Sequence, residues 1–203
     1  MKRLGILLSG RGSNFEAIAR NIEAGELAAR VAIVLSNRSN APGIFTARQM
    51  GLNAVVIPSQ GVEREIYDQQ LVAHLEQAQV DLVCLAGFMR LLSSRFIRPF
   101  EGRILNIHPS LLPAFPGLDA QRQALEHGVK ITGCTVHFVD ESLDAGPIVL
   151  QAAVPVLDED TAETLSARIL AEEHRIFPLA IAKVLSGSYR IEGRRVLGLG
   201  QRG

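Results

Sequence analysis

The first indication of the fold comes from residues 4–22, which read LGILLSGRGSNFEAIARNI. Leu4–Leu8 is a short aliphatic run, typical of a strand that is buried on both faces. After the loop Ser9–Asn14, apolar residues recur from Phe15 to Ile22 at the spacing of one helix face. A strand, a loop and a helix in this order predict the start of a β-α-β unit.

The same alternation continues through the first half of the chain. Further short apolar runs have the character of buried strands: Val31–Leu35, Ala54–Ile57, Asp81–Ala86 and Ile104–Ile107. Helical patterns separate the successive strands as far as the fourth, and one of these helices is opened by Pro42 and closed by Gly51. Strands that alternate with helices form parallel sheets. We therefore predict an α/β fold, with a Rossmann-like, mostly parallel, twisted sheet and helices on both faces.

The second half of the chain has a different pattern. The expected elements are a proline-rich loop at Asn106–Leu118, a short helix around Ala120–His127, two paired strands at Ile131–Val139 and Ile148–Pro155, and a long helix that ends near Leu185. Asp160-Thr161-Ala162-Glu163 resembles a capping box at the start of the long helix, and Pro178 predicts a kink inside it. We predict a single domain over residues 1–186 and a C-terminal tail over 187–203, because no linker separates two cores.

The composition excludes several classes of protein. The chain has 203 residues, 47% of them hydrophobic, and 21 basic side chains balance 21 acidic ones. This composition rules out disorder as the main state, and zero net charge argues against a nucleic-acid backbone or an anionic membrane as the principal partner. No apolar run is long enough for a membrane helix, and the run after Met1-Lys2-Arg3 is too short for a signal peptide. We therefore expect a cytoplasmic protein.

Cysteine and histidine usage gives no sign of a disulfide framework or a metal site. Cys84 and Cys134 lie in apolar runs, which predicts buried, inert thiols. The five histidines form no i,i+4 or His-x-His pair, so no metal is expected. His137 shares a strand face with Thr135, but inside an apolar strand we expect it to be a core histidine with satisfied hydrogen bonds.

Ligands of open α/β sheets bind at the carboxyl ends of the strands, so functional residues are expected in the loops there. In the loop Ser9–Asn14, glycines allow close approach of a ligand, and the following helix start favours an anion. Phe15 stands where a dinucleotide fingerprint has its third glycine and no Walker lysine is present, so a single phosphate fits better than NAD or ATP. A tight turn in which Ser13 or Asn14 caps the helix is the structural alternative. The loop Gly87–Leu92 suits a flat heterocycle or is simply a helix entry.

Polar side chains at the end of the fifth strand suggest a catalytic pair. Asn106 and His108 alternate with Ile107, so both are expected to project from one face. An amide and an imidazole side by side can polarise a carbonyl and stabilise an oxyanion. Asp144, in the turn Asp140–Pro147, would keep that imidazole charged or fix its tautomer, but the sequence does not show whether the two meet. The alternatives are a structural histidine and a solvated turn.

Four motifs together resemble one family. They are Ser9-Gly10-Arg11-Gly12-Ser13-Asn14, Leu85-Ala86-Gly87-Phe88-Met89-Arg90, Asn106-Ile107-His108-Pro109-Ser110-Leu111-Leu112-Pro113 and Leu143-Asp144-Ala145-Gly146-Pro147. In combination they resemble phosphoribosylglycinamide formyltransferase, a folate-dependent enzyme of purine biosynthesis, from the first strand to the long last helix. The resemblance implies the formyltransferase fold. It also implies transfer of a formyl group from 10-formyltetrahydrofolate to the amine of 5-phosphoribosylglycinamide, without a metal.

The resemblance further implies a role for each matching residue. The catalytic residues would be Asn106, His108 and Asp144. Phosphoribosylglycinamide would be bound by Gly12, Ser13, Asn14, Pro109 and Glu173. The folate would be bound by Arg64, Met89, Arg90, Leu91, Leu92, Asn106, Asp140, Glu141 and Asp144. The partners would be these two small molecules, with no nucleic acid and no membrane, and the chain would act as a monomer or homodimer.

The sequence departs from the family pattern at a few positions and leaves competing readings. Asp119 and Gln121 stand where many relatives have histidines, and Leu170 where a polar substrate contact can occur. Methionyl-tRNA formyltransferase needs a tRNA-binding domain, for which a chain of 203 residues leaves no room. Formyltetrahydrofolate hydrolase would add an N-terminal regulatory domain. A non-catalytic sensor of sugar phosphates or folate has no need of the intact catalytic trio.

Overall fold

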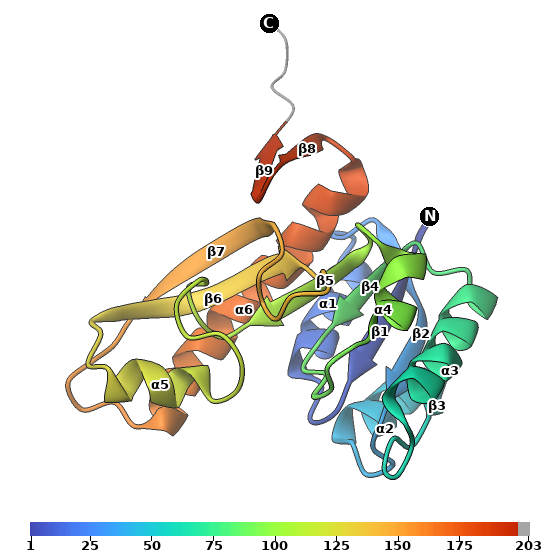
Figure 1. Ribbon diagram of the computed structural model, residues 1–203, viewed down its shortest axis with the longest axis horizontal. Coiled ribbons are helices and arrows are strands. Elements are labelled where there is room, and N and C mark those ends of the chain that lie inside the picture. The colour runs from blue at the N-terminus through green and yellow to red at the C-terminus, as the bar shows by residue number, and fades with distance from the viewer. Residues whose placement is uncertain (199–203) are drawn as a thin grey trace, which may run out of the picture. The chain divides into compact units, whose positions relative to one another are not determined.

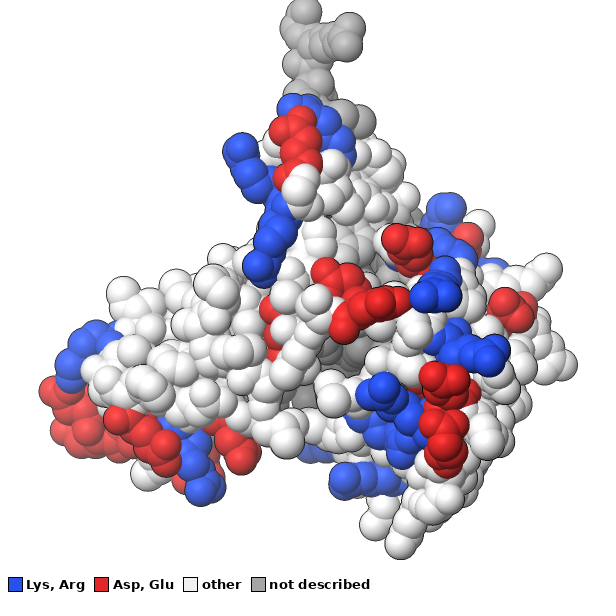
Figure 2. Space-filling view, viewed as in Figure 1, with Lys and Arg blue, Asp and Glu red and all other residues white. Residues whose placement is uncertain are grey.

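The structure is a computed structural model that describes residues 1–198 (Figure 1). It divides into two compact units, residues 1–106 and the residues from 107 onward, which are described in turn. Figure 2 shows acidic and basic side chains intermixed on the face drawn, as expected when the two are equal in number. Within the described residues, no helix is both long and apolar enough to cross a membrane.

The first unit is built on parallel strands. They are β1 (Lys2–Leu8), β2 (Ala29–Ser36), β3 (Ala54–Val56), β4 (Leu82–Leu85) and the start of β5 (Ile104–His108). Their order in the sheet is β3-β2-β1-β4-β5, and every pairing among them is parallel. Aliphatic side chains explain this arrangement, because residues 6–8 of β1 are fully buried, as a strand covered on both faces requires.

The helices of the first unit follow the strands as crossovers. They are α1 (Ser13–Glu23), α2 (Pro42–Gln49), α3 (Arg64–Gln77) and α4 (Ser94–Ile97), with a 3₁₀ turn at Arg98–Phe100. Crossovers between parallel strands are right-handed, so the advance from β1 to β3 puts α1 and α2 on one face of the sheet. The return to β4 puts α3 on the other. The predicted α/β fold, with a mostly parallel sheet and helices on both faces, is confirmed.

The second unit combines an antiparallel pair with a long helix. Its elements are α5 (Ala120–Glu126), β6 (Ile131–Phe138), β7 (Ile148–Pro155), α6 (Ala162–Ser186), β8 (Tyr189–Glu192) and β9 (Arg195–Gly198). The expected pairing of β6 with β7 is confirmed as antiparallel. Helix α6 packs on both strands and buries Leu165, Ile169 and Phe177. The apolar stripe of α6 thus forms the core of this unit.

The structure differs from the prediction at the start of α6. The N-cap is Thr161, and its capping box is completed by Thr164, so neither Asp160 nor Glu163 has the position expected for it. Asp160 is engaged elsewhere, because its carboxylate accepts hydrogen bonds from Arg168 and from the backbone N–H of Leu157.

The expected tail also contains regular structure. Strands β8 and β9 form an antiparallel hairpin, and β9 pairs with β7 at one position. The last five residues, 199–203, lie outside the described part of the chain.

Candidate active site

The loop after β1 enters α1 through a left-handed glycine. Gly12 is the N-cap residue of α1 and has a φ angle of 79°. A Cβ atom on Gly12 would lie 2.9 Å from the Cα of Gly43, so glycine is required for both conformation and space. The alternative in which Ser13 or Asn14 is the N-cap residue is wrong, since the N-cap is Gly12 and Ser13 is already the first helical residue. Backbone N–H groups at such a helix start suit an anion.

The loop after β4 presents apolar side chains to solvent. Met89 is 59% exposed and Leu91 is 61% exposed, unusual values for large hydrophobic residues. The neighbouring Arg90 turns back onto the protein. Its guanidinium lies 4.6 Å from the centre of the Tyr67 ring, and its Nη1 donates to the backbone oxygen of Ser59 at 3.2 Å. The loop therefore combines exposed apolar surface with a firmly held middle residue.

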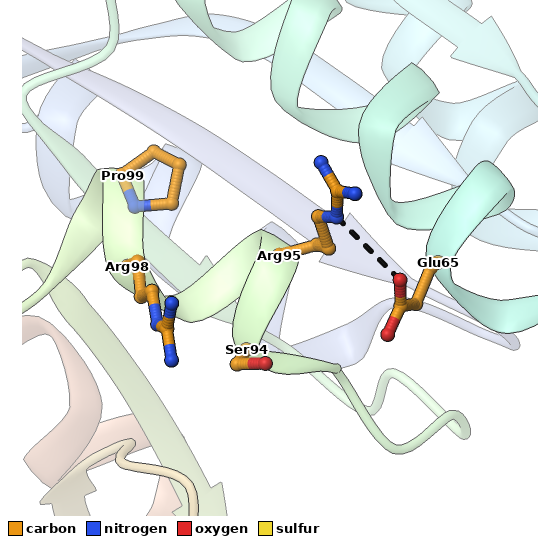
Figure 3. A pocket seen from close by; sticks show the side chains of 5 residues that line it. All are labelled: Glu65, Ser94, Arg95, Arg98 and Pro99. Atoms are coloured by element: carbon orange, nitrogen blue, oxygen red, sulfur yellow. Dashed lines mark ion pairs between the residues drawn. The ribbon is translucent and has the colours of Figure 1, made fainter.

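Arg64, the first residue of α3, is exposed. Its neighbour Glu65 lines a pocket of about 450 Å³ with residues of α4 and the 3₁₀ turn: Ser94, Arg95, Arg98 and Pro99 (Figure 3). The Arg95 Nε lies 3.5 Å from the Glu65 Oε2, in an ion pair between half-exposed side chains. None of the residues lining this pocket is a predicted site residue, and an exposed ion pair of this kind contributes little to binding.

His108, the last residue of β5, has a partner at each ring nitrogen. Its Nε2 lies 2.8 Å from the backbone oxygen of Phe115, and its Nδ1 lies 3.5 Å from Oδ2 of Asp144. A carbonyl oxygen can only accept a hydrogen bond, so Nε2 bears the hydrogen of the neutral ring. A second proton would go to Nδ1 and form an ion pair with Asp144. The histidine is 4% exposed, so this pair is shielded from solvent.

Asp144 also fixes the loop opposite to it. The residue has a φ angle of 48°, in the left-handed region. Its Oδ2 accepts a hydrogen bond of 2.8 Å from the backbone N–H of Gly117, in the proline-rich loop. The distance that the sequence could not supply is thus 3.5 Å between His108 and Asp144, and it brings two of the three predicted catalytic residues together.

The proline-rich loop that supplies the Phe115 carbonyl is anchored to β6 and β7. The Thr135 hydroxyl donates to the backbone oxygen of Ser110 at 2.7 Å and accepts from the backbone N–H of Leu112 at 3.0 Å. From β7, the Gln151 amide donates to the backbone oxygen of Leu112 at 2.9 Å. These bonds fix the position of the loop that contacts His108.

His137 is a neighbour of His108 and Asp144 that the sequence analysis did not assign to the site. It is 2% exposed, as expected for a core histidine, and its Nδ1 lies 2.8 Å from the Phe138 backbone oxygen. Its Nε2 lies 3.7 Å from Oδ1 of Asp144, so the carboxylate stands between two imidazoles. Burial lowers the pKa of His137 below its usual 6.5. A register shift after Val136 directs His137 here, and only its shared face with Thr135 hinted at this in the sequence.

The remaining predicted residues lie in both units. In the first, Asn106 is half-buried on β5, two residues before His108. In the second, Pro109 is half-buried, Glu173 is 7% exposed on α6, and Asp140 and Glu141 are exposed. The predicted contacts of these residues with substrates stay predictions.

The cysteines and the potential metal ligands lie as follows. Cys84 and Cys134 are both buried and free, as predicted, and burial raises the pKa of the Cys134 thiol to about 12. The described residues contain no group of three or more histidine, cysteine or acidic side chains arranged to hold a metal ion.

Comparison with known proteins identifies the family. A family model described as formyl transferase matches residues 2–181. This chain belongs to that family. Phosphoribosylglycinamide formyltransferase of Escherichia coli is 43% identical to it over 187 residues, which cover 92% of this formyl transferase chain and 88% of the relative. The crystal structure of glycinamide ribonucleotide transformylase 1 from Symbiobacterium toebii matches it with 54% identity and a TM-score of 0.96, covering 98% of this chain and 95% of the other.

Longer relatives contain a similar segment. The trifunctional purine biosynthetic protein adenosine-3 of Drosophila melanogaster is 48% identical to this formyl transferase over 190 residues, or 92% of the chain. The chain spans only 14% of the length of that protein.

Proposed function

We propose that this formyl transferase moves the formyl group of 10-formyltetrahydrofolate to the amine of 5-phosphoribosylglycinamide, giving formylglycinamide ribonucleotide and tetrahydrofolate. The observation that carries the proposal is the buried contact of 3.5 Å between His108 and Asp144, at the end of a strand that also bears Asn106. This arrangement suits formyl transfer because the reaction builds negative charge on one oxygen, and the site offers an amide and an imidazole held beside a carboxylate.

The reaction needs no redox step. The substrate amine attacks the formyl carbon, a new C–N bond forms, and the carbonyl electron pair moves onto the formyl oxygen. In the proposal, Asn106 and the protonated His108 donate hydrogen bonds to that oxyanion, while Asp144 stabilises the positive ring. The oxyanion then collapses, and the bond between the formyl carbon and N10 of the folate breaks. N10 takes up a proton, and the attacking nitrogen loses one through water or His108.

The proposed substrate contacts follow the loops of the first unit. The substrate phosphate would lie at Gly12, Ser13 and Asn14, where the start of α1 supplies backbone N–H groups without needing a surplus of basic side chains. The pterin would lie against the loop after β4, whose exposed Met89 and Leu91 match a flat apolar ring system.

Residues of the second unit would make further contacts with both substrates. Pro109 and Glu173 would contact the nucleotide, with Glu173 accepting hydrogen bonds from the ribose hydroxyls. Asp140 and Glu141 belong to the turn that would close over the pterin. Because both substrates are free small molecules, we further propose that the chain works in the cytoplasm, without nucleic acid or membrane, as a monomer or homodimer.

A direct assay tests the proposed function. The purified chain is incubated with 10-formyltetrahydrofolate, with and without 5-phosphoribosylglycinamide. Absorbance then follows the released folate, and mass spectrometry detects the formylated nucleotide. Release that depends on the nucleotide, with a formylated product, supports the proposal. Release without the nucleotide would instead identify a formyl folate hydrolase, and binding of both ligands with no release would identify a sensor.

A further inference from the structure

A buried serine connects the two loops to which the proposed function assigns the two substrates. Ser9, directly after β1, is 2% exposed. Its backbone N–H donates to the backbone oxygen of Gly87 at 3.0 Å, and its hydroxyl oxygen accepts from the backbone N–H of Met89 at 2.8 Å. We call Ser9–Asn14 the phosphate loop and Gly87–Leu92 the folate loop. The first residue of the phosphate loop therefore holds the first half of the folate loop through two hydrogen bonds.

The same hydroxyl also donates a hydrogen bond to a residue of another loop. Ser9 Oγ donates to the side-chain oxygen of Asn37 at 2.6 Å, and Asn37, directly after β2, is 8% exposed. The Asn37 amide group donates to the Ser59 hydroxyl at 3.3 Å, and the Asn37 backbone oxygen accepts from the Ser59 N–H at 3.4 Å. The Ser59 backbone oxygen accepts from Arg90 Nη1 at 3.2 Å, which closes a circuit back to the folate loop.

This hydrogen-bonded circuit joins the segments that follow β1, β2, β3 and β4, whose positions Figure 1 shows. The Ser9 hydroxyl is the atom at which the phosphate loop enters the circuit. A buried hydroxyl with a donor and an acceptor partner allows little change in the position of either. A displacement of the phosphate loop must therefore move the Met89 N–H or break its bond. A displacement of the folate loop must likewise act on Ser9.

We propose that Ser9 and Asn37 are positioning residues that couple the two substrate subsites, so that occupation of one loop favours binding at the other. The inference rests on the proposed function, because that function assigns a phosphate to the first loop and a folate to the second. Coupling of this kind is reciprocal, so each ligand strengthens the other by the same factor. Neither residue touches a reacting atom in this account. Both act through Met89 and Arg90.

The test measures binding without turnover. The probes are 5-phosphoribosylglycinamide and tetrahydrofolate, which lacks the formyl group and so gives no reaction. Calorimetry gives the Kd of the nucleotide alone and in the presence of saturating tetrahydrofolate. We expect tetrahydrofolate to lower the nucleotide Kd of the unmodified chain by about 5-fold or more, a typical coupling between sites. The Ser9→Ala variant should bring this ratio close to one and raise KM for both substrates more than it lowers kcat.

Control variants separate coupling from simple loss of structure. Ser39→Ala changes an exposed serine in the segment after β2 and should leave the Kd ratio unchanged. Ser59→Ala removes only the outer hydroxyl of the circuit at a half-buried position, so it should fold normally and reduce the ratio in part. Circular dichroism and the melting temperature of each variant confirm that the native fold is present.

The outcomes distinguish the two proposals. If both ligands bind the unmodified chain independently, or if Ser9→Ala and Ser59→Ala keep the full ratio, the coupling is overturned while the formyl transfer activity stands. If the unmodified chain binds neither ligand, both the function and the coupling are overturned.

Discussion

At the scale of single residues, the proposed chemistry depends on an aspartate that lies between two histidines. Asp144 lies 3.5 Å from His108 and 3.7 Å from His137, and it also accepts a hydrogen bond from the Gly117 backbone. A charge is thus placed where an imidazolium would form, and the loop hydrogen bond limits its movement. Removal of the charge and removal of the imidazole should therefore have similar effects on the chemical step.

We expect Asp144→Asn and His108→Ala each to lower kcat by about 10²–10⁴-fold, with KM for both substrates changed much less. The asparagine keeps the shape of the side chain and an acceptor for Gly117, but loses the charge. Steady-state kinetics of formyl transfer measure the effect. Asp158→Asn serves as the control, because that exposed carboxylate pairs with Lys130. Turnover near the unmodified level in either variant would remove the catalytic assignment.

His137 makes the stability of the protein depend on pH. Burial lowers its pKa in the folded state below the usual 6.5, so in mildly acid solution the unfolded chain binds a proton that the folded chain does not. Stability should be highest above pH 6.5 and should fall as the pH decreases toward the pKa of the folded protein. Melting temperatures between pH 8 and pH 5 test this, and His137→Gln should flatten the curve in that range. A half-exposed histidine on α3, changed in His74→Gln, should leave its shape unaltered.

At the scale of elements, two neighbouring polar residues at the start of α6 have different functions: Asp160 pairs with Arg168, and Thr161 caps the helix. Arg168 donates two hydrogen bonds, of 2.7 and 2.8 Å, to the Asp160 carboxylate and holds the pKa of that carboxyl well below its usual range. Asp160 is thereby committed to joining α6 to the end of β7, where Arg168 also reaches the Pro155 backbone oxygen. The capping role passes to Thr161.

Thr161→Ala should lower the free energy of unfolding by about 1 kcal/mol, because it removes the acceptor for the Thr164 N–H at the helix start. Denaturant titration measures the change. Thr161→Ser keeps the hydroxyl and should stay within a few tenths of a kcal/mol of the unmodified chain. If the alanine and serine variants are equally stable, Thr161 does not act as a cap.

The predictable part of the fold is the part governed by local pattern. Leu4–Leu8 and the later aliphatic runs identify the strands because a strand buried on both faces tolerates few polar residues. The same pattern located the loops at the strand ends, although it did not identify Gly12 as the N-cap of α1. Hairpin β8–β9 was missed because its two strands are only four residues long and bury little surface, so the sequence gives them no extended apolar pattern.

The sequence singled out His108 and Asp144 as candidates, but it could not give the distance between them. Asn106 and His108 stood out together because they share a strand end. Asp144 could be linked to His108 only through resemblance, because a turn far along the sequence gives no local sign of where its side chain points. The place of His137 depends on a register shift between β6 and β7, which the sequence pattern does not show.

At the scale of the whole molecule, equal numbers of acidic and basic residues are compatible with the two proposed substrates, both of which are anionic. Backbone N–H groups at the start of α1 can hold a phosphate, so attraction can be local and needs no surplus of lysine or arginine. The hydrogen-bonded circuit from Ser9 to Arg90 joins the start of this loop to the segments that follow β2, β3 and β4. The fold thus links anion binding at one loop to the position of another.

The hydrogen bond between His108 Nε2 and the Phe115 carbonyl bears on how the proposed mechanism would distinguish the ground state from the transition state. In the free protein the donor is already satisfied by an uncharged oxygen, so a formyl carbonyl that replaces it exchanges one neutral acceptor for another and gains little. An oxyanion at the same place is a much stronger acceptor. In the proposed mechanism, the Phe115 carbonyl would therefore offset the interaction of His108 with the formyl oxygen of the bound substrate, so that His108 would bind the transition state preferentially.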